Sequence, residues 1–253
     1  MRQDRRGPFV AALEHARETA YPSGEYVGQE SFMSAAEIRR LADRAGIRLG
    51  ATVLDLCCGV AGPGRLITTE RRCRYLGVDY SGSALETARA LAGNLPCRFE
   101  QAHVPPLPDG RFDVVLLLET MLAFPDKPAL LAGIAHGLEH GGRFACTAEV
   151  GAPLTAEERA AMPDADTVWP IELPEFTQVL RSAGLTVTWQ EDWTAAHRAT
   201  ATALLQAFRS HAAEISRGIG GRAVTELIDA HELWVEWLGG GRVRKVALVA
   251  EKR

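Results

Sequence analysis

The sequence predicts an α/β fold in which a mostly parallel sheet of seven strands is covered by helices on both faces. Short apolar runs rich in branched side chains alternate with stretches of helical periodicity, a pattern typical of strands joined by helical crossovers. The expected strands are 52–56, 75–78, 97–101, 114–118, 143–149, 186–191 and 243–250. The expected helices between them are 65–70, 83–92, 127–138 and 174–183.

Two helical regions lie outside this alternation. Residues 8–45 contain two helical stretches around a Tyr21-Pro22-Ser23-Gly24 turn. A second helical region precedes the last strand, where a bare sheet needs only a tight connection, and it is interrupted at Gly218-Ile219-Gly220-Gly221. We therefore expect an N-terminal helical lid over residues 1–48, a core of residues 49–194 and 239–253, and a helical cap insert over residues 195–238 that covers a pocket.

Composition favours a protein that acts on small molecules. A chain of 253 residues buries a full core, and its 28 Lys and Arg against 32 Asp and Glu give a net charge of -4 with no basic stripe for nucleic acid. Met1–Arg6 has no apolar run behind it that could form a secretory signal or a membrane span. We expect a cytoplasmic monomer or homodimer with no nucleic-acid or membrane partner.

Cysteine and histidine usage predicts neither disulfides nor a metal site. The five cysteines are odd in number and include no C-x-x-C pair. The seven histidines are scattered. His136 and His140 are four residues apart, but His140 belongs to a predicted turn, which makes a shared metal ion improbable.

The strongest local signal is the loop after the first expected strand, Val53-Leu54-Asp55-Leu56-Cys57-Cys58-Gly59-Val60-Ala61-Gly62-Pro63-Gly64. Small residues there allow the backbone to approach a ligand, and the following helix start offers unpaired N–H groups. The dinucleotide spacing G-x-G-x-x-G falls on Cys57, Gly59 and Gly62, so its first glycine is missing. An acidic Asp55 also disfavours a diphosphate and suits a ligand that carries an ammonium group.

The second expected strand ends in a carboxylate, in Tyr75-Leu76-Gly77-Val78-Asp79-Tyr80-Ser81. Asp79 follows the glycine loop by about 20 residues, which is the position of a ribose-binding acid. Its two oxygens are suited to accept two neighbouring hydroxyls. The alternative is that Asp79 caps the next helix, although Ser81 is itself a good capping residue.

These segments resemble the class I S-adenosylmethionine-dependent methyltransferases, particularly small-molecule enzymes with a methyltransferase domain of the 11/25 type. The family's glycine motif is D-x-G-x-G-x-G, of which Asp55 and Gly59 match, while Cys57 and Ala61 replace glycines. Gly62-Pro63 is similar to members that carry an L-C-C-G-x-x-G-P version. The resemblance implies a Rossmann-like fold with S-adenosylmethionine as the cofactor, S-adenosylhomocysteine as its product, and no metal.

The resemblance spans roughly residues 49–183 and also implies which residues hold the cofactor. It assigns this role to Asp55, Gly59, Ala61, Asp79, Tyr80, Gln101, Ala102 and Glu119. Tyr80 is expected to flank the adenine. Gln101 stands where the family usually has Asp and is expected to accept a bond from the adenine amine, and Ala102 to offer a backbone N–H. Asp113, before the fourth strand, is expected to be structural.

The expected catalytic residues are Glu119, at the end of the fourth strand, and His197, after the sixth. Glu119 is suited either to orient or deprotonate an acceptor or to bond backbone N–H groups, and the sequence does not decide between these roles. Glu149 and His231 are further candidates for a base. The aromatic residues expected to wall the acceptor are Tyr21, Tyr26, Phe32, Trp169 and Trp193, whereas Trp234 and Trp237 are expected to seal the insert against the core.

The function that these observations favour is methyl transfer from S-adenosylmethionine to a nitrogen, carbon or oxygen atom of a small molecule, in bacterial specialised metabolism. One alternative is a catalytically silent S-adenosylmethionine-binding sensor or partner subunit, which needs no acceptor space. Another is a nicotinamide-dependent enzyme, which the damaged dinucleotide spacing disfavours.

Overall fold

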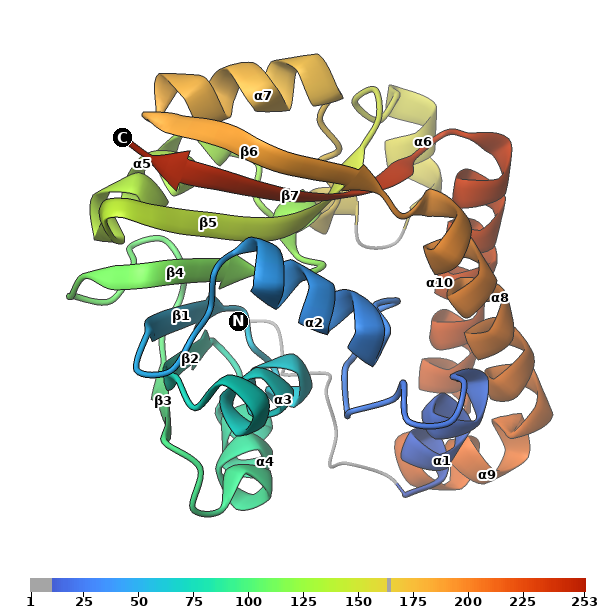
Figure 1. Cartoon of the computed structure of the whole chain (residues 1–253). Coiled ribbons are helices and arrows are strands. Elements are labelled where there is room, and N and C mark those ends of the chain that lie inside the picture. Colours follow the sequence, from blue (N-terminus) through green and yellow to red (C-terminus); the bar gives the residue numbers. More distant parts are fainter. Residues whose placement is uncertain (1–10, 163–164) are drawn as a thin grey trace.

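The computed structural model describes residues 11–162 and 165–253 (Figure 1). The expectation for Met1–Arg6 and the first ten residues of the expected lid lie outside the described residues. The strands are β1 Thr52–Leu56, β2 Arg74–Asp79, β3 Cys97–Gln101, β4 Phe112–Leu117, β5 Leu138–Val150, β6 Leu185–Asp192 and β7 Arg244–Lys252. The helices are α1 Ala11–Ala20, α2 Ala35–Arg44, α3 Gly62–Arg71, α4 Gly82–Ala92, α5 Lys127–Gly137, α6 Ala156–Ala161, α7 Leu173–Ser182, α8 Thr194–Ser210, α9 Ala212–Ile219 and α10 Gly221–Gly240.

The seven strands form one sheet in the order β3-β2-β1-β4-β5-β7-β6. β7 is antiparallel to both of its neighbours, and the pairs from β3 through to β5 are parallel. The strand order reverses between β1 and β4, so the loops at the carboxyl ends of these strands diverge and leave a crevice there. The expected seven-stranded, mostly parallel α/β sheet is confirmed, and the crevice places the site.

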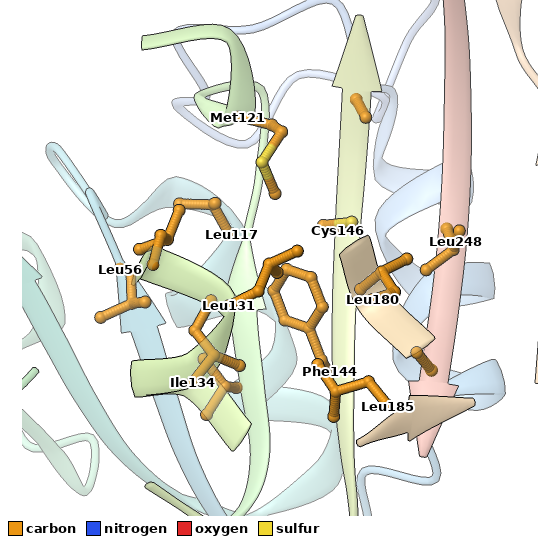
Figure 2. Close-up of a cluster of buried hydrophobic side chains, with 14 of the residues drawn as sticks. Leu56, Leu117, Met121, Leu131, Ile134, Phe144, Cys146, Leu180, Leu185 and Leu248 are labelled. Carbon is orange, nitrogen blue, oxygen red and sulfur yellow. The ribbon is translucent and has the colours of Figure 1, made fainter. Parts of the chain in front are cut away.

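Helices cover both faces of the sheet and bury two separate apolar layers. On one face, α5 and α7 pack over side chains such as Leu56, Leu117, Phe144 and Leu248, which Figure 2 shows converging between the strands and the helices. On the other face, α2, α3 and α4 contribute to a second layer. Strands that are buried on both faces need continuous apolar runs, which is why these strands could be predicted from the sequence.

The N-terminal helix and the insert form a third cluster beside the sheet, here called the cap cluster. It joins Ala16 of α1, Tyr21 and Phe32 to residues of α8, α9 and α10, among them Leu204 and Phe208. Figure 1 shows α1 lying against α8, α9 and α10 at one end of the sheet. The expected break in the insert is present, because α9 ends at Ile219 and α10 begins at Gly221.

The structure departs from the expected elements in the connection between β5 and α7. Helix α6 and a short 3-10 turn, Ala165–Thr167, lie where no element was expected. A capping box starts α6, because Thr155 accepts from the Glu158 backbone and Glu158 accepts from the Thr155 backbone. β5 also begins at Leu138 rather than at Arg143, across a register irregularity opposite β4. The expected turn residues 139–142 therefore fall within the range of the strand, between its paired residues Leu138 and Arg143.

In the part of the chain that the structure describes, no helix combines the length and the apolar character that crossing a membrane requires.

Close approach of α3 to the sheet fixes the start of the site. An added Cβ on Gly64 would lie 2.2 Å from the ring of Tyr75 on β2, and one on Gly62 would lie 2.5 Å from the backbone of Gly28. Real Cβ atoms do not approach other atoms so closely, so both positions require glycine. Helix α3 is therefore pressed against β2 on one side and against the N-terminal segment on the other.

We predict that Gly64→Ala destabilises the chain, because the new methyl group overlaps the Tyr75 ring. The free energy of unfolding is expected to fall by about 1 to 3 kcal/mol, the usual cost of overpacking, although alanine favours helix. Chemical denaturation followed by circular dichroism measures it. The control is Gly240→Ala in α10, whose Cβ has no neighbour within 4 Å and which should be neutral or slightly stabilising. Equal stability of the two variants would contradict the prediction.

Candidate active site at the carboxyl edge of the sheet

The loop between β1 and α3 has the shape of a glycine motif although two of its three glycines are replaced. Cys57, Gly59 and Ala61 all adopt left-handed conformations, with φ of 59°, 54° and 57°. A side chain in this region costs roughly 1 to 2 kcal/mol, so Cys57 and Ala61 hold a strained backbone. The alternating positions match those of the glycines in D-x-G-x-G-x-G. The departures from the motif therefore leave its backbone path in place.

Asp79 ties this loop to the end of β2. Its carboxylate accepts the Gly59 N–H through Oδ2 and the Ser81 N–H through Oδ1, both at 2.9 Å, and the residue is 3% exposed. Ser81 itself caps α4 by accepting from Ala84, so Asp79 is not the cap. The Ala102 N–H, which we expected to face the cofactor, donates to the Asp79 carbonyl oxygen at 3.1 Å. Asp79 is thus the buried charge that joins the two strand ends.

Flat, accessible groups lie beside Asp79. The Tyr80 side chain is 51% exposed, and its ring stacks on His103 with centroids 5.9 Å apart and planes 14° apart. Gln101 Nε2 donates to the Tyr80 carbonyl at 3.0 Å, which leaves its Oε1 as the atom suited to accept from a ligand amine. His103 was not expected here. Its position directly after Gln101-Ala102 was the only signal for it.

Asp55 lies deeper than the sequence suggested. Its side chain is buried beneath the loop and accepts the Tyr75 hydroxyl at 2.6 Å. Burial raises the pKa of Asp55 to about 7, an effect that the Tyr75 hydrogen bond opposes and the nearby Asp79 charge assists. Contact of Asp55 with a ligand ammonium group stays a prediction, whereas its contact with Tyr75 is present in the structure.

A second cluster of charges lies across the crevice from Asp79, on β5, β7 and the end of β4. Lys245 Nζ donates to Glu119 Oε2 at 2.7 Å and to Glu149 Oε1 at 2.5 Å. Glu149 and Lys245 face each other in the β5–β7 register. Glu119 follows β4 with φ of 59°, and its N–H donates to Thr147 Oγ1 at 2.6 Å. Lys245 is not predicted from the sequence, where its one signal is a lysine within an apolar strand.

The cluster keeps its charges. Burial by itself raises the pKa of Glu119, but the Lys245 ammonium and then His197 outweigh it and hold that pKa well below its usual range. Burial lowers the pKa of Lys245, whereas Glu119 and Glu149 raise it above the ordinary value. An ionised carboxylate with so low a pKa is a weak proton acceptor. Of the roles left open for Glu119, deprotonation of an acceptor is therefore disfavoured, whereas a backbone N–H bond is present, because Glu119 Oε2 accepts the Phe32 N–H at 3.4 Å.

His197 lies behind Glu119 and not at the cavity surface. Its ring is fully buried, with Nδ1 3.7 Å from Glu119 Oε1 and Nε2 3.5 Å from Glu37 Oε2. Trp193 is packed beside it, with ring centroids 5.8 Å apart. His197 is thus placed to position Glu119, and its expected role as a base stays a prediction.

A cavity of about 200 Å³ opens beside the charged cluster. Its lining is Arg17, Tyr21, Gln29, Glu30, Ser31, Phe32, Glu119, Glu149, Leu204, Phe208, Leu227, Ala230, His231, Trp234 and Lys245. The Lys245 ammonium lies 5.1 Å from the Phe32 ring centroid and 5.0 Å from that of Trp234. The cavity thus has an ionic end, aromatic walls and contributions from both the N-terminal segment and the insert.

The structure brings some of the expected acceptor residues to this cavity and places others elsewhere. Tyr21 and Phe32 line it, whereas the Tyr26 hydroxyl donates to Glu14 at 2.6 Å. The guanidinium carbon of Arg159 lies 4.0 Å from the centroid of the Trp169 ring, and Trp169 is not part of this lining. The structure likewise keeps Trp193 within the apolar layer under α2 and α3.

Two cavity residues were assigned differently by sequence. Trp234, expected only to seal the insert, also walls the cavity, and His231 was named only as one of several bases. His231 Nδ1 donates to the Leu227 carbonyl at 2.8 Å, and burial lowers the pKa of this ring. His231 is therefore neutral near pH 7.

No group of three or more His, Cys, Asp or Glu side chains among the described residues is arranged to hold a metal ion.

Comparison with known proteins places the middle of the chain in a recognised domain family. Residues 53–142 match the family model of a methyltransferase domain. The chain is 32% identical over 164 residues to 27-O-demethylrifamycin SV methyltransferase from Amycolatopsis mediterranei, which covers 60% of each chain. It is 28% identical over 178 residues to phosphoethanolamine N-methyltransferase 3 from Arabidopsis thaliana, over 67% of this chain and 36% of that protein. The chain therefore spans less than two thirds of the length of these relatives.

Solved structures share the fold at low sequence identity. A cyclopropane synthase from Mycobacterium tuberculosis superposes with a TM-score of 0.82 at 14% identity, over 96% of this chain and 95% of that one. A phosphoethanolamine N-methyltransferase from Haemonchus contortus, solved with phosphomonomethylethanolamine and S-adenosylhomocysteine, superposes with a TM-score of 0.79 at 16% identity, over 94% and 56%. These likenesses establish the fold.

We predict that Asp55→Asn makes the chain more stable at pH 8 and that its advantage shrinks at pH 5. The folded pKa of about 7 lies above the ordinary 3.8, so the stability from protonated Asp55 is lost as pH rises through 7. The advantage of the variant should grow by up to about 1.4 kcal/mol per pH unit between the two pKa values. Urea denaturation of the variant and the parent at several pH values measures this difference in the free energy of unfolding.

The control for this prediction is Asp113→Asn. Asp113 Oδ2 accepts the Thr52 N–H at 2.7 Å and the Thr52 hydroxyl at 2.8 Å, as its expected structural role requires. The Thr52 backbone bond lowers the pKa of Asp113, so its stabilisation is lost as pH falls. Asp113→Asn should therefore destabilise at neutral pH, opposite in sign to Asp55→Asn. An Asp55→Asn effect that does not change with pH would refute the assignment.

Proposed function

We propose that the chain is a class I S-adenosylmethionine-dependent methyltransferase, which transfers the methyl group of S-adenosylmethionine to a small molecule. The observation that carries the proposal is the Asp79 carboxylate, which is buried where the glycine loop meets the end of β2. A carboxylate on this edge, beside the strand-order reversal, suits the two hydroxyls of a ribose.

The residues around Asp79 fit the remaining parts of this cofactor. The exposed rings of Tyr80 and His103 offer flat faces for an adenine, and Gln101 Oε1 is an acceptor for its amine. The left-handed loop through Gly59 and Ala61 presents backbone to the methionine part. We propose that Glu119, and Asp55 beneath the loop, supply the negative charge that faces the ammonium and sulfonium groups.

The cofactor supplies a methyl group that its sulfonium already activates, so the chain needs to bind, orient and exclude water. We propose that the cap cluster excludes water, because Phe32 packs against both the insert and the Lys245 ammonium. Glu119 then orients the acceptor from the ionic end of the cavity. His197 holds Glu119 from behind, within 3.7 Å.

The cavity supports an enzyme in preference to a silent binding protein. A volume of about 200 Å³ beside Glu119 provides space for a compact acceptor, which a sensor or partner subunit does not need. The similarity to 27-O-demethylrifamycin SV methyltransferase, from a bacterium, supports a role in bacterial specialised metabolism. Fold and family by themselves do not specify the acceptor.

The test of this function has two stages. Isothermal titration with S-adenosylmethionine, S-adenosylhomocysteine and NAD establishes the cofactor, and we expect binding of the first two alone. Release of S-adenosylhomocysteine over a panel of amines, phenols and indoles then tests turnover. NAD binding without S-adenosylmethionine binding would overturn the proposal. Cofactor binding without turnover across the panel would favour the silent sensor.

We predict that Asp79→Asn weakens S-adenosylmethionine binding by about 1.5 to 3 kcal/mol, the scale of a hydrogen bond to a charged group. The amide keeps the size of the carboxylate and one acceptor oxygen, so the loop should retain part of its support. Calorimetry on the variant, with circular dichroism to verify folding, measures the effect. The control is Asp229→Asn on the exposed surface of α10, which should bind like the parent. Unchanged affinity in folded Asp79→Asn would remove Asp79 from the site.

A further inference from the structure

Two buried carboxylates at the ionic end of the cavity each keep one oxygen that has no hydrogen-bond partner among the described residues. These atoms are Oε2 of Glu149 and Oε1 of Glu119, of which the second lies 3.7 Å from His197 Nδ1, beyond hydrogen-bond distance. The two side chains are 7% and 1% exposed, and each gives its other oxygen to Lys245. Buried charged acceptors are normally satisfied by a donor, so both atoms are suited to the N–H groups of a bound molecule.

The charges around the cavity favour a cation. Lys245 is one ammonium shared between two carboxylates. The other lining cation, Arg17, pairs with Glu14 and Glu30, each at 3.0 Å. Besides His231, whose pKa burial lowers, the acidic and basic side chains of the lining are two basic residues and three carboxylic residues. A positively charged or strongly donating group is therefore attracted to this end, and an anion is repelled.

The walls next to this end are apolar and aromatic. Phe32 meets Trp234 edge to face with centroids 5.9 Å apart, and it meets His231 in the same way at 5.9 Å. Tyr21 and Phe208 extend the wall away from the charges. Such walls bind the apolar part of a ligand and also stabilise a neighbouring cation through the ring faces.

From these observations, and resting on the proposed methyl transfer, we infer that the methyl acceptor is an amine that carries an apolar or aromatic group. Its N–H groups bind Glu119 Oε1 and Glu149 Oε2. Its apolar part lies against Phe32 and Trp234.

The reaction balances without a base. An amine that arrives as its ammonium form first loses one proton to solvent, because only the neutral amine has a lone pair. That lone pair forms the bond to the methyl carbon, the carbon–sulfur bond breaks, and its electron pair stays on sulfur as S-adenosylhomocysteine forms. The nitrogen keeps its remaining protons and leaves as the methylated ammonium ion. Positive charge thus moves from sulfur to nitrogen, and Glu119 and Glu149 stabilise it where it develops. A phenolate would instead bring negative charge against both carboxylates.

Binding to the parent chain tests the inference with four probes of one skeleton: 2-phenylethylamine, N-methyl-2-phenylethylamine, 2-phenylethanol and 3-phenylpropionate. Each is titrated into the free chain and into its S-adenosylhomocysteine complex. We expect the two amines to bind roughly ten- to hundredfold more tightly than the alcohol, and the carboxylate not to bind. Equal binding of alcohol and amine, tighter binding of the carboxylate, or no binding of either amine overturns the inference.

Substitution locates the effect. Glu149→Gln keeps the side-chain size but converts one acceptor oxygen to an amide, so the preference for amine over alcohol should fall at least about tenfold while S-adenosylhomocysteine affinity is kept. Glu86→Gln, exposed on α4, is the matched control and should keep the parent's preference. A full preference in folded Glu149→Gln overturns the inference. If that variant fails to fold, Glu119→Gln is titrated with the same probes in the free chain alone, because Glu119 is also proposed to face the cofactor, and the probe ranking on the parent remains decisive.

The inference and the proposed function fail separately. If the chain does not bind S-adenosylmethionine or S-adenosylhomocysteine, the proposed methyl transfer is wrong, and the amine series on the free chain still reports on the cavity. If the cofactor binds and the amines do not, methyl transfer stands and the amine acceptor is excluded.

Discussion

A buried ammonium group on β7 organises the ionic end of the cavity. Lys245 is 2% exposed, and an unpaired charge at such a depth would cost several kcal/mol, so Glu119 and Glu149 must stay where they compensate it. Its backbone has a second task, because its carbonyl accepts the Trp193 N–H at 2.8 Å and its N–H donates to Thr194 Oγ1 at 3.0 Å. One residue thus fixes both the ionic end of the cavity and the start of the insert.

The cap depends on this arrangement and in turn closes it. Phe32 belongs to the cap cluster, lies over the Lys245 ammonium, and has its N–H 3.4 Å from Glu119 Oε2. The segment before it lies against α3, where the Gly28 backbone leaves no room for a side chain on Gly62. The N-terminal segment therefore contacts both the start of α3 and the cavity.

The sheet could be predicted from the sequence, whereas much of the candidate site could not. Buried parallel strands need continuous apolar runs and the loop needs small residues, so both are local patterns. The ion pair of Lys245 with Glu149 could not be predicted, because it depends on the strand register that sets the two residues opposite each other. Aromatic character alone likewise does not say which expected residues meet at one cavity, since Phe32 lines it whereas Trp193 and Trp169 do not. Helix α6 was not predicted, because its six residues follow a capping box but are too few to show a periodic pattern of apolar side chains.

The residues of the site lie partly inside the matched domain and partly outside it, which limits what the domain match says about function. The matched domain, residues 53–142, contains the glycine loop, Asp79 and Glu119. The other groups that shape the acceptor cavity, such as Phe32, Trp234 and Lys245, all lie outside it. The domain match therefore bears on the proposed cofactor residues, whereas the cavity is built by segments that only the tertiary fold assembles. Because a fold does not specify a substrate, the chemistry of this cavity is the better guide to what it binds.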